Sequence, residues 1–122
     1  MNIAIVGASC ERSKFGNKAV RAYLDNGDRV FPINPFEERI EGIVVHKRVS
    51  DVGEHLDVVS LYVPPTVGIL LIPELVSVHV PVVYLNPGAE SNELILALKR
   101  EGIEPRLACS ILAIGKNPGD YQ

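Results

Sequence analysis

Small, polar and basic residues that suit a phosphate group follow an apolar run near the start of the chain. Gly7-Ala8-Ser9 comes directly after Ile3 to Val6, a run typical of a strand buried on both faces. The free amides of a helix that begins after such a turn bind anions, and the helix dipole adds to the attraction. We therefore predict a phosphate site and a nucleotide-containing ligand. The candidate residues are Gly7, Ala8, Ser9, Arg12, Ser13, Lys14, Phe15 and Gly16.

This turn matches neither of two common phosphate-binding motifs. A dinucleotide fingerprint needs glycine where the chain has Ser9, and a Walker loop would follow Lys14 with serine or threonine instead of Phe15. An ordinary strand-to-helix turn, shaped by glycine and capped by serine, is therefore an alternative interpretation.

The end of the second predicted strand argues against a nicotinamide cofactor. A dinucleotide enzyme usually places an acidic residue there to bind the ribose hydroxyls. In this chain the strand ends at Asn34-Pro35, and no Asp or Glu lies between 29 and 36. Arg39 is suited to a 2′- or 3′-phosphate on a ribose, although a solvated surface arginine is the competing interpretation.

The elements that must position these residues alternate between strand and helix patterns with short connections. This alternation predicts an α/β fold: a three-layer Rossmann-like domain over residues 1–122, with a five-stranded, mainly parallel sheet. Strands are expected at 3–6, 29–33, 57–63, 82–85 and 103–109, and helices at 15–25, 66–78 and 91–101. A short extended piece at 43–45 precedes a brief helix that Ser50 or Asp51 can cap.

Turn-forming and polar residues follow every predicted strand of this sheet. The carboxyl ends of parallel strands share one edge, and ligands bind at that edge in open α/β sheets. We therefore predict one cleft there, with simple strand termination as the alternative for each proline. The groups concerned are Gly7 to Ser9, Asn34-Pro35, Pro64-Pro65-Thr66, Asn86-Pro87-Gly88 and Cys109-Ser110.

Length and composition restrict the partners and the location. The chain has 122 residues, 47% of them hydrophobic, and a net charge of −3, so no basic stripe is available for nucleic acid. No apolar run is long enough to cross a membrane. Met1 leads directly into a predicted core strand and leaves no room for a signal peptide. These features predict a cytoplasmic protein that binds neither nucleic acid nor membranes.

Four motifs in register resemble the stand-alone CoA-binding domain family, which is similar to the CoA-binding domain of the succinyl-CoA synthetase α subunit. The resemblance covers about residues 2–109. The motifs are Ile3-Ala4-Ile5-Val6-Gly7-Ala8-Ser9, Val30-Phe31-Pro32-Ile33-Asn34-Pro35, Val63-Pro64-Pro65 and Leu85-Asn86-Pro87-Gly88.

The resemblance implies a CoA site along the predicted cleft. Gly7, Ala8, Ser9 and the loop from Ser13 to Gly16 would bind the CoA phosphates, and Asn34 and Pro35 would border the adenosine. Val63, Pro64 and Pro65 would line the groove for adenine or pantetheine. Asn86, Pro87 and Gly88 form the fourth motif, and Cys109 matches a family cysteine near the end of the fifth strand. The family commonly has Gln at the position of Asn86 and Pro at that of Ser110, and its members continue differently after the cysteine.

Catalysis finds little support, so a binding role is favoured over an enzyme. No metal, triad or hydrolase motif is present, and His46, His55 and His79 lie in separate segments. Cys10 lies near a predicted helix N-terminus, which would lower its thiol pKa. A mixed disulfide between a cysteine and CoA is one hypothesis, and two free thiols in a reducing cytosol is the other.

Two functional hypotheses follow. The first is a module that binds coenzyme A or acyl-CoA as a sensor, carrier or accessory protein without chemistry of its own. The second is a small NADP-type oxidoreductase, or a nucleotide-binding subunit of a larger complex. The predicted helix at 66–78 is apolar on nearly all sides, which favours a homodimer through this helix. A tail that folds back from Ile111 over the same helix is the alternative.

Overall fold

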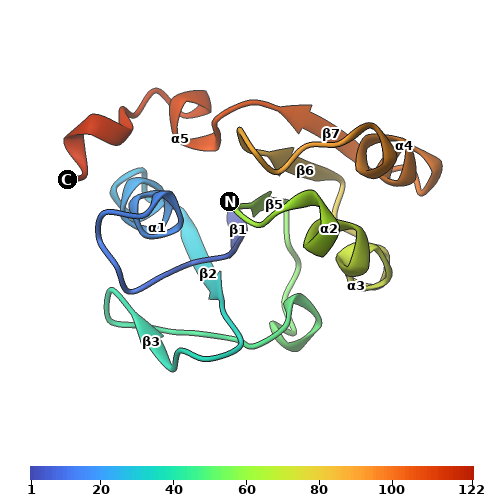
Figure 1. Cartoon of the computed structure of the whole chain (residues 1–122). Helices are drawn as coiled ribbons and strands as arrows, with labels where there is room; N and C mark the ends of the chain where they lie inside the picture. Colours follow the sequence, from blue (N-terminus) through green and yellow to red (C-terminus); the bar gives the residue numbers. More distant parts are fainter.

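The computed structural model describes residues 1–122 and is built around a sheet of five parallel strands (Figure 1). The order across the sheet is β2-β1-β5-β6-β7. Together with helices on both faces, this sheet confirms the predicted three-layer Rossmann-like fold. The strands are β1 (Asn2–Val6), β2 (Arg29–Ile33), β5 (Val58–Leu61), β6 (Val82–Leu85) and β7 (Glu104–Leu107); β3 (Arg39–Ile40) and β4 (Ile43–Val44) form a separate antiparallel pair.

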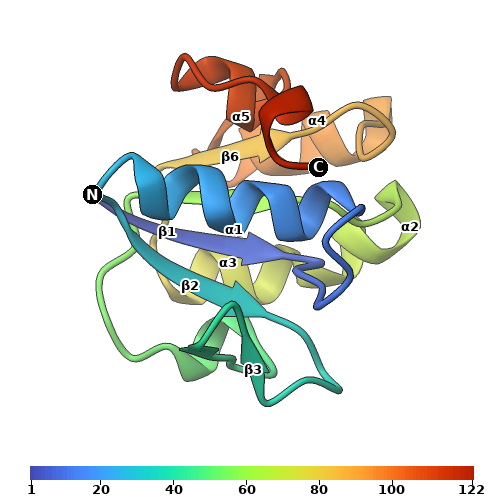
Figure 2. The ribbon, with the colours of Figure 1, turned by 90° about the vertical axis from the view of Figure 1, so that its left-hand side faces the viewer.

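The helices divide between the two faces of the sheet. On one face lie α1 (Phe15–Asp25), which runs back along β1 and β2 (Figure 2), and α5 (Ser110–Ala113). On the other face lie α2 (Pro65–Gly68), α3 (Ile72–Ser77) and α4 (Asn92–Arg100). Two hydrophobic cores result, one under each layer, because alternate residues of each strand point to opposite faces. Ile3 and Ile5 of β1 belong to the α1 core, and Ala4 and Val6 to the other.

Two glycines allow the start of α1 to pack tightly against the end of β1. Gly7 has a φ of +85°, and a Cβ there would lie 2.5 Å from the carbonyl oxygen of Tyr62. A Cβ on Gly16 would lie 2.2 Å from the carbonyl oxygen of Gly7. Real Cβ atoms do not approach backbone this closely, so both positions require glycine. The close packing brings the first turn of α1 to the carboxyl edge of the sheet.

The prediction of one helix over 66–78 is wrong. The segment forms α2, a 3-10 turn at Ile69–Leu71 and then α3. Pro73 has no N–H and fits a helix only in its first turn, which is where α3 places it. The break therefore follows from Pro73, which starts a new helix. Gly68, at the end of α2, serves close packing instead, since a Cβ there would be 2.9 Å from Cδ2 of Leu94 in α4.

Several smaller boundaries also differ from the prediction. The third and fifth strands of the sheet are shorter than 57–63 and 103–109, because Tyr62, Val63 and Cys109 already belong to the loops at the edge. Neither Ser50 nor Asp51 caps the brief helix, which is a 3-10 turn at Val49–Asp51 preceded by Arg48. The expected cap of α4 is present, since Ser91 Oγ accepts a hydrogen bond of 3.1 Å from the Leu94 N–H.

The apolar surface on α2 and the turn after it stays open. Leu70 is 75% exposed and Val67 is 40% exposed. The tail does not cover them, because Ile111 is buried in the other core, next to α1. The alternative in which the tail folds back over this segment is therefore wrong.

The two edge strands of the sheet have different surroundings. Along β2, the His46 N–H donates to the Pro32 carbonyl oxygen at 3.1 Å, and the Asn34 N–H donates to the His46 carbonyl oxygen at 3.0 Å. β7 pairs with β6 alone and carries Pro105. None of the helices combines the length and the apolar character needed to span a bilayer.

Candidate functional site

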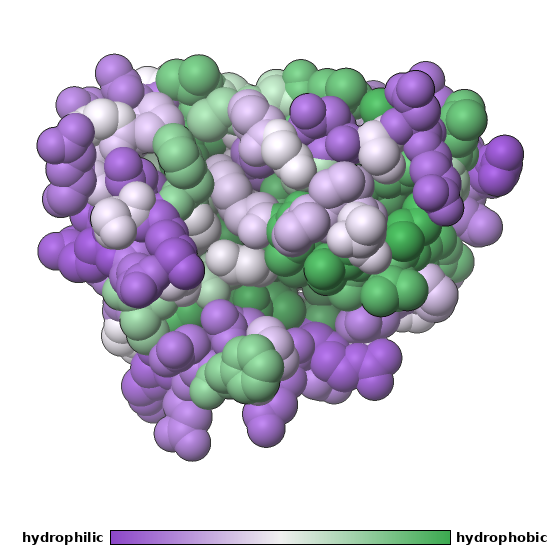
Figure 3. Space-filling view, in the orientation of Figure 1, coloured by the Kyte–Doolittle hydropathy of each residue, from purple (hydrophilic) through white to green (hydrophobic).

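A cavity of about 310 Å³ opens at the carboxyl edge of the sheet, between the ends of β1 and β5. The chain leaves β1 toward β2 on one side and later returns to β5 on the other, so this is the switch point where open α/β sheets bind ligands. Figure 3, which looks onto this edge, shows hydrophobic residues on the side of α2 and α3 and hydrophilic residues over the loop into α1. The cavity is lined by Gly7, Lys14, Phe15, Gly16, Tyr62, Val63, Pro64, Pro87, Gly88 and Ala89.

One end of this cavity has the chemistry of an anion site. Phe15 and Gly16 line the cavity and begin α1, and their N–H groups have no hydrogen-bond partner in the protein. The positive end of the α1 dipole lies at the same place. Lys14 also lines the cavity, and its Nζ forms a 2.9 Å ion pair with the Glu11 carboxylate, which partly neutralises its charge. These free backbone amides are chemically suited to a phosphate, and the Lys14 side chain lies beside them.

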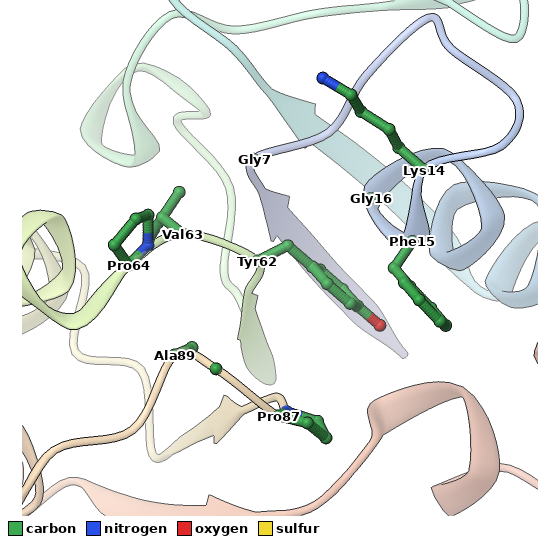
Figure 4. A pocket seen from close by; sticks show the side chains of 10 residues that line it. Gly7, Lys14, Phe15, Gly16, Tyr62, Val63, Pro64, Pro87 and Ala89 are labelled. Carbon is green, nitrogen blue, oxygen red and sulfur yellow. The ribbon is translucent and has the colours of Figure 1, made fainter.

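A second, smaller cavity of about 100 Å³ adjoins the first. The two share Phe15, Tyr62 and Pro87, and the second is completed by Asn86 and Cys109. In Figure 4 the side chains of Phe15 and Tyr62 converge, Pro87 lies across from them, and Lys14 points the other way, past Gly7. A ligand with a phosphate at α1 can therefore continue along these shared walls toward Cys109.

Asn86 has a structural role as well as a place in the wall of the second cavity. Its side chain is 2% exposed, and its amide donates 2.8 Å hydrogen bonds to Ser60 Oγ and to the Leu61 carbonyl oxygen. Its Oδ1 accepts a 2.8 Å hydrogen bond from the Ser110 N–H. Asn86 therefore ties β5, β6 and α5 together, and both of its amide hydrogens are used within the protein.

Eight of the predicted site residues line neither cavity. Asn34 joins two loops of the edge, because its amide donates to the Ala8 carbonyl oxygen at 2.8 Å while its Oδ1 accepts from the Phe36 N–H. Arg12 lies 3.5 Å from Glu41, and Arg39 donates to the Gly42 carbonyl oxygen. These residues surround the cavities at a greater distance, or shape the loops that form them. The eight are Ala8, Ser9, Arg12, Ser13, Asn34, Pro35, Arg39 and Pro65.

Two residues of the cavity walls, Tyr62 and Ala89, were not predicted from the sequence. Each directly neighbours a predicted motif, since Tyr62 precedes Val63-Pro64 and Ala89 follows Pro87-Gly88. Burial raises the pKa of Tyr62 to about 12, so its hydroxyl stays protonated at neutral pH. The local signals that could have identified Tyr62 are its place directly after β5 and directly before the Val63-Pro64 motif.

The expected effect of the helix on Cys10 is wrong. The thiol is exposed, and its Sγ lies 3.1 Å from the Glu37 carboxylate, which raises its pKa. A neighbouring negative charge disfavours the thiolate, and α1 begins five residues farther along. Cys109 is partly buried at the second cavity, so the two free thiols belong to different places on this edge.

These features assign the chain to the Rossmann-like α/β proteins that carry a ligand cavity at the switch point of the sheet. Residues 1–114 match a family described as a CoA binding domain, and the chain belongs to that family. The family expected from the four sequence motifs is thereby confirmed.

Proteins that are similar to this chain in sequence or structure include larger ligases and proteins of about the same length. The chain is 35% identical over 63 residues to the ADP-forming acetate-CoA ligase of Methanocaldococcus jannaschii. These aligned residues make up 52% of this chain and 9% of the ligase. The chain therefore matches only a small part of that enzyme. A conserved hypothetical protein from Pyrococcus furiosus has a TM-score of 0.84 and 32% identity, covering 92% of this chain and 97% of that one. A further similar structure is the dinucleotide-forming acetyl-coenzyme A synthetase 1 of Ca. Korarchaeum cryptofilum, solved with phosphate and ADP. Its TM-score is 0.76 and its sequence identity is 29%, and the match covers 85% of this chain and 25% of the synthetase chain.

Proposed function

We propose that this protein binds coenzyme A or an acyl-CoA in the two adjoining cavities, as a sensor, carrier or accessory module without chemistry of its own. The observation that carries the proposal is the pair of unpartnered N–H groups of Phe15 and Gly16 at the switch point. Backbone amides at a helix N-terminus are suited to a pyrophosphate. Membership of the CoA binding domain family supports the same ligand.

The shape of the site supports a definite orientation of the ligand. The pyrophosphate would lie at the first turn of α1, and the pantetheine arm would run along Phe15, Tyr62 and Pro87 toward Cys109. The adenosine would then lie toward the end of β2, where Asn34 and Pro35 form the loop. Arg39 is close by in sequence and has no carboxylate partner, so it is available to a 3′-phosphate.

The proposal extends to assembly and location. A homodimer through Val67 and Leu70 would cover the open apolar surface after β5. A cytoplasmic location fits a ligand that is used in metabolism inside the cell. The proposal includes neither nucleic acid nor a membrane as a partner, and the net charge of −3 leaves no basic stripe for a nucleic-acid backbone.

A pair of variants at Phe15 tests the phosphate site. Phe15→Asp places a carboxylate at the first residue of α1, where it stabilises the helix but repels a phosphate. Phe15→Asn is the matched control, since it removes the same ring and adds a neutral side chain of the same shape. We expect calorimetry to show CoA binding to the wild type, reduced binding to Phe15→Asn and at least tenfold weaker binding to Phe15→Asp.

Two outcomes would contradict the proposal. Equal CoA affinities for Phe15→Asp and Phe15→Asn, with both proteins folded, would show that the phosphates of CoA do not bind at the start of α1. Tighter binding of NADPH than of CoA to the wild type would favour the oxidoreductase hypothesis instead.

A further inference from the structure

A chain of four hydrogen-bonded side chains runs from three buried residues, Asn86, Ser60 and Ser110, to the partly buried Tyr62 at the wall of the second cavity. Ser60 Oγ is 2.8 Å from Ser110 Oγ, which is 2.9 Å from the hydroxyl oxygen of Tyr62. Asn86 stands at the other end of the chain, with its amide nitrogen 2.8 Å from Ser60 Oγ. Each hydroxyl carries one hydrogen, so the direction of donation along the chain can be worked out from its fixed end.

The direction is set by the backbone around Asn86. Its Oδ1 accepts from the Ser110 N–H and its nitrogen donates to the Leu61 carbonyl oxygen, so the amide has one possible orientation. The same nitrogen must therefore donate to Ser60 Oγ. Ser60 is fully buried, and the only remaining partner for its own hydrogen is Ser110 Oγ. The reverse order would leave the buried hydroxyl hydrogen of Ser60 without an acceptor, which is unfavourable.

The rest of the chain follows from this order. Ser110 accepts from Ser60 and gives its hydrogen to the Tyr62 oxygen. The Tyr62 oxygen is then the last acceptor of this chain of hydrogen bonds, and the hydroxyl hydrogen of Tyr62 has no acceptor within the protein. Tyr62 lines the second cavity beside Cys109 and Phe15.

We propose that Tyr62 binds the ligand by donating this hydrogen to a carbonyl oxygen of the CoA arm, and that Ser60 and Ser110 are positioning residues that order the donor. The carbonyl belongs either to an amide of the pantetheine or to the thioester of an acyl-CoA. A cavity of about 100 Å³ restricts an acyl group there to a short one. This inference rests on the proposed binding of CoA.

The test compares Tyr62→Phe with the wild type for three ligands: CoA, acetyl-CoA and adenosine 3′,5′-diphosphate, which has no arm. Removing one hydrogen bond is expected to weaken binding about five- to tenfold. We expect this loss for CoA and acetyl-CoA if the acceptor is an amide, and for acetyl-CoA alone if it is the thioester. Binding of adenosine 3′,5′-diphosphate should stay unchanged.

Tyr23→Phe is the matched control. The Tyr23 hydroxyl donates to the Ser110 carbonyl oxygen at 2.8 Å and is buried, but it lies outside the chain of hydroxyls. Its loss should lower stability and leave the ratio of CoA to adenosine 3′,5′-diphosphate affinity unchanged. Ser60→Ala keeps Tyr62 intact but removes the donor that orders the chain, so it should lower that ratio by a smaller factor than Tyr62→Phe.

The outcomes separate this inference from the proposed function. A wild-type protein that binds none of the three ligands would overturn both. Normal binding of CoA and acetyl-CoA by Tyr62→Phe would overturn the inference alone. It would also be overturned if Tyr62→Phe weakened all three ligands equally, or if Tyr23→Phe had the same effect on the ratio.

Discussion

The carbonyl oxygen of Gly7 faces the Cα of Gly16 so closely that a Cβ on Gly16 would lie 2.2 Å away from it. This contact fixes the first turn of α1 against the end of β1, and it holds the free N–H groups of Phe15 and Gly16 at the cavity. The position of the proposed anion site therefore depends on the absence of a single methyl group.

Gly16→Ala should accordingly damage both stability and binding. The obstructing atom belongs to the backbone, so α1 must move, and we expect the free energy of unfolding to fall by about 1 to 3 kcal/mol. Urea denaturation and calorimetry with CoA would measure the two effects. Gly119→Ala is the control, because its Cβ would meet only the side chain of Asn117, at 3.2 Å. A Gly16→Ala protein with wild-type stability would show that α1 does not depend on this contact.

The raised pKa of Tyr62 predicts a loss of stability in alkaline solution. The pKa is about 12 in the folded protein, above the ordinary value of 10.0, because burial disfavours the phenolate. Above pH 10 the unfolded chain therefore loses this proton first. The stabilising contribution is complete below about pH 10 and is lost as the pH rises toward about 12. Denaturation at several alkaline pH values should show a shallower decline for Tyr62→Phe than for the wild type, and parallel declines would exclude this role for Tyr62.

Leu70→Glu should abolish self-association if the proposed homodimer forms through α2 and the turn after it. Leu70 is 75% exposed, so a charge there costs the single chain little while it opposes an apolar interface. Light scattering at micromolar concentration should show a dimer for the wild type and a monomer for the variant. Leu112→Glu, at a position 60% exposed on α5, should leave the dimer intact. A monomeric wild type would reject the dimer.

Cys109 should exchange with CoA disulfide if the arm ends beside it. Its thiolate would attack one sulfur of the CoA disulfide, form a mixed disulfide and release one CoA thiol. Mass spectrometry should show one added CoA, removed by dithiothreitol, in the wild type and in Cys10→Ser but not in Cys109→Ser. Binding raises the local concentration of the reagent, so the reaction should be faster than with a small disulfide. Equal rates would mean that Cys109 is only an accessible thiol.

The sequence predicted the sheet, and a cleft at its carboxyl edge, because both depend on local patterns. Short apolar runs followed by glycine, proline or asparagine place strands and turns without any knowledge of distant contacts. The edge of a parallel sheet then brings Gly7, Val63 and Pro87 together by topology alone.

The missed features depend on contacts between distant segments. The role proposed for Tyr62 depends on its hydrogen bond with Ser110, which lies 48 residues farther along the chain. Arg12 and Cys10 each lie beside a carboxylate, Glu41 from the turn between β3 and β4 and Glu37 from the loop before β3, and no local pattern predicts either contact. The break between α2 and α3 could have been predicted, because Pro73 stands in the middle of the apolar run.

The two edges of the sheet determine how the molecule meets its neighbours at high concentration. An open strand edge is a template for pairing between chains and for aggregation. At β2 the chain itself covers the carboxyl end of the edge, through the hydrogen bonds of His46 with Pro32 and Asn34. At β7 the Glu104 N–H donates to the Pro81 carbonyl oxygen, so the next residue faces outward, and that residue is Pro105, which has no hydrogen to donate. Each edge of the sheet thus has one feature that opposes pairing with the edge of another copy: the bridge at His46 on β2 and Pro105 on β7.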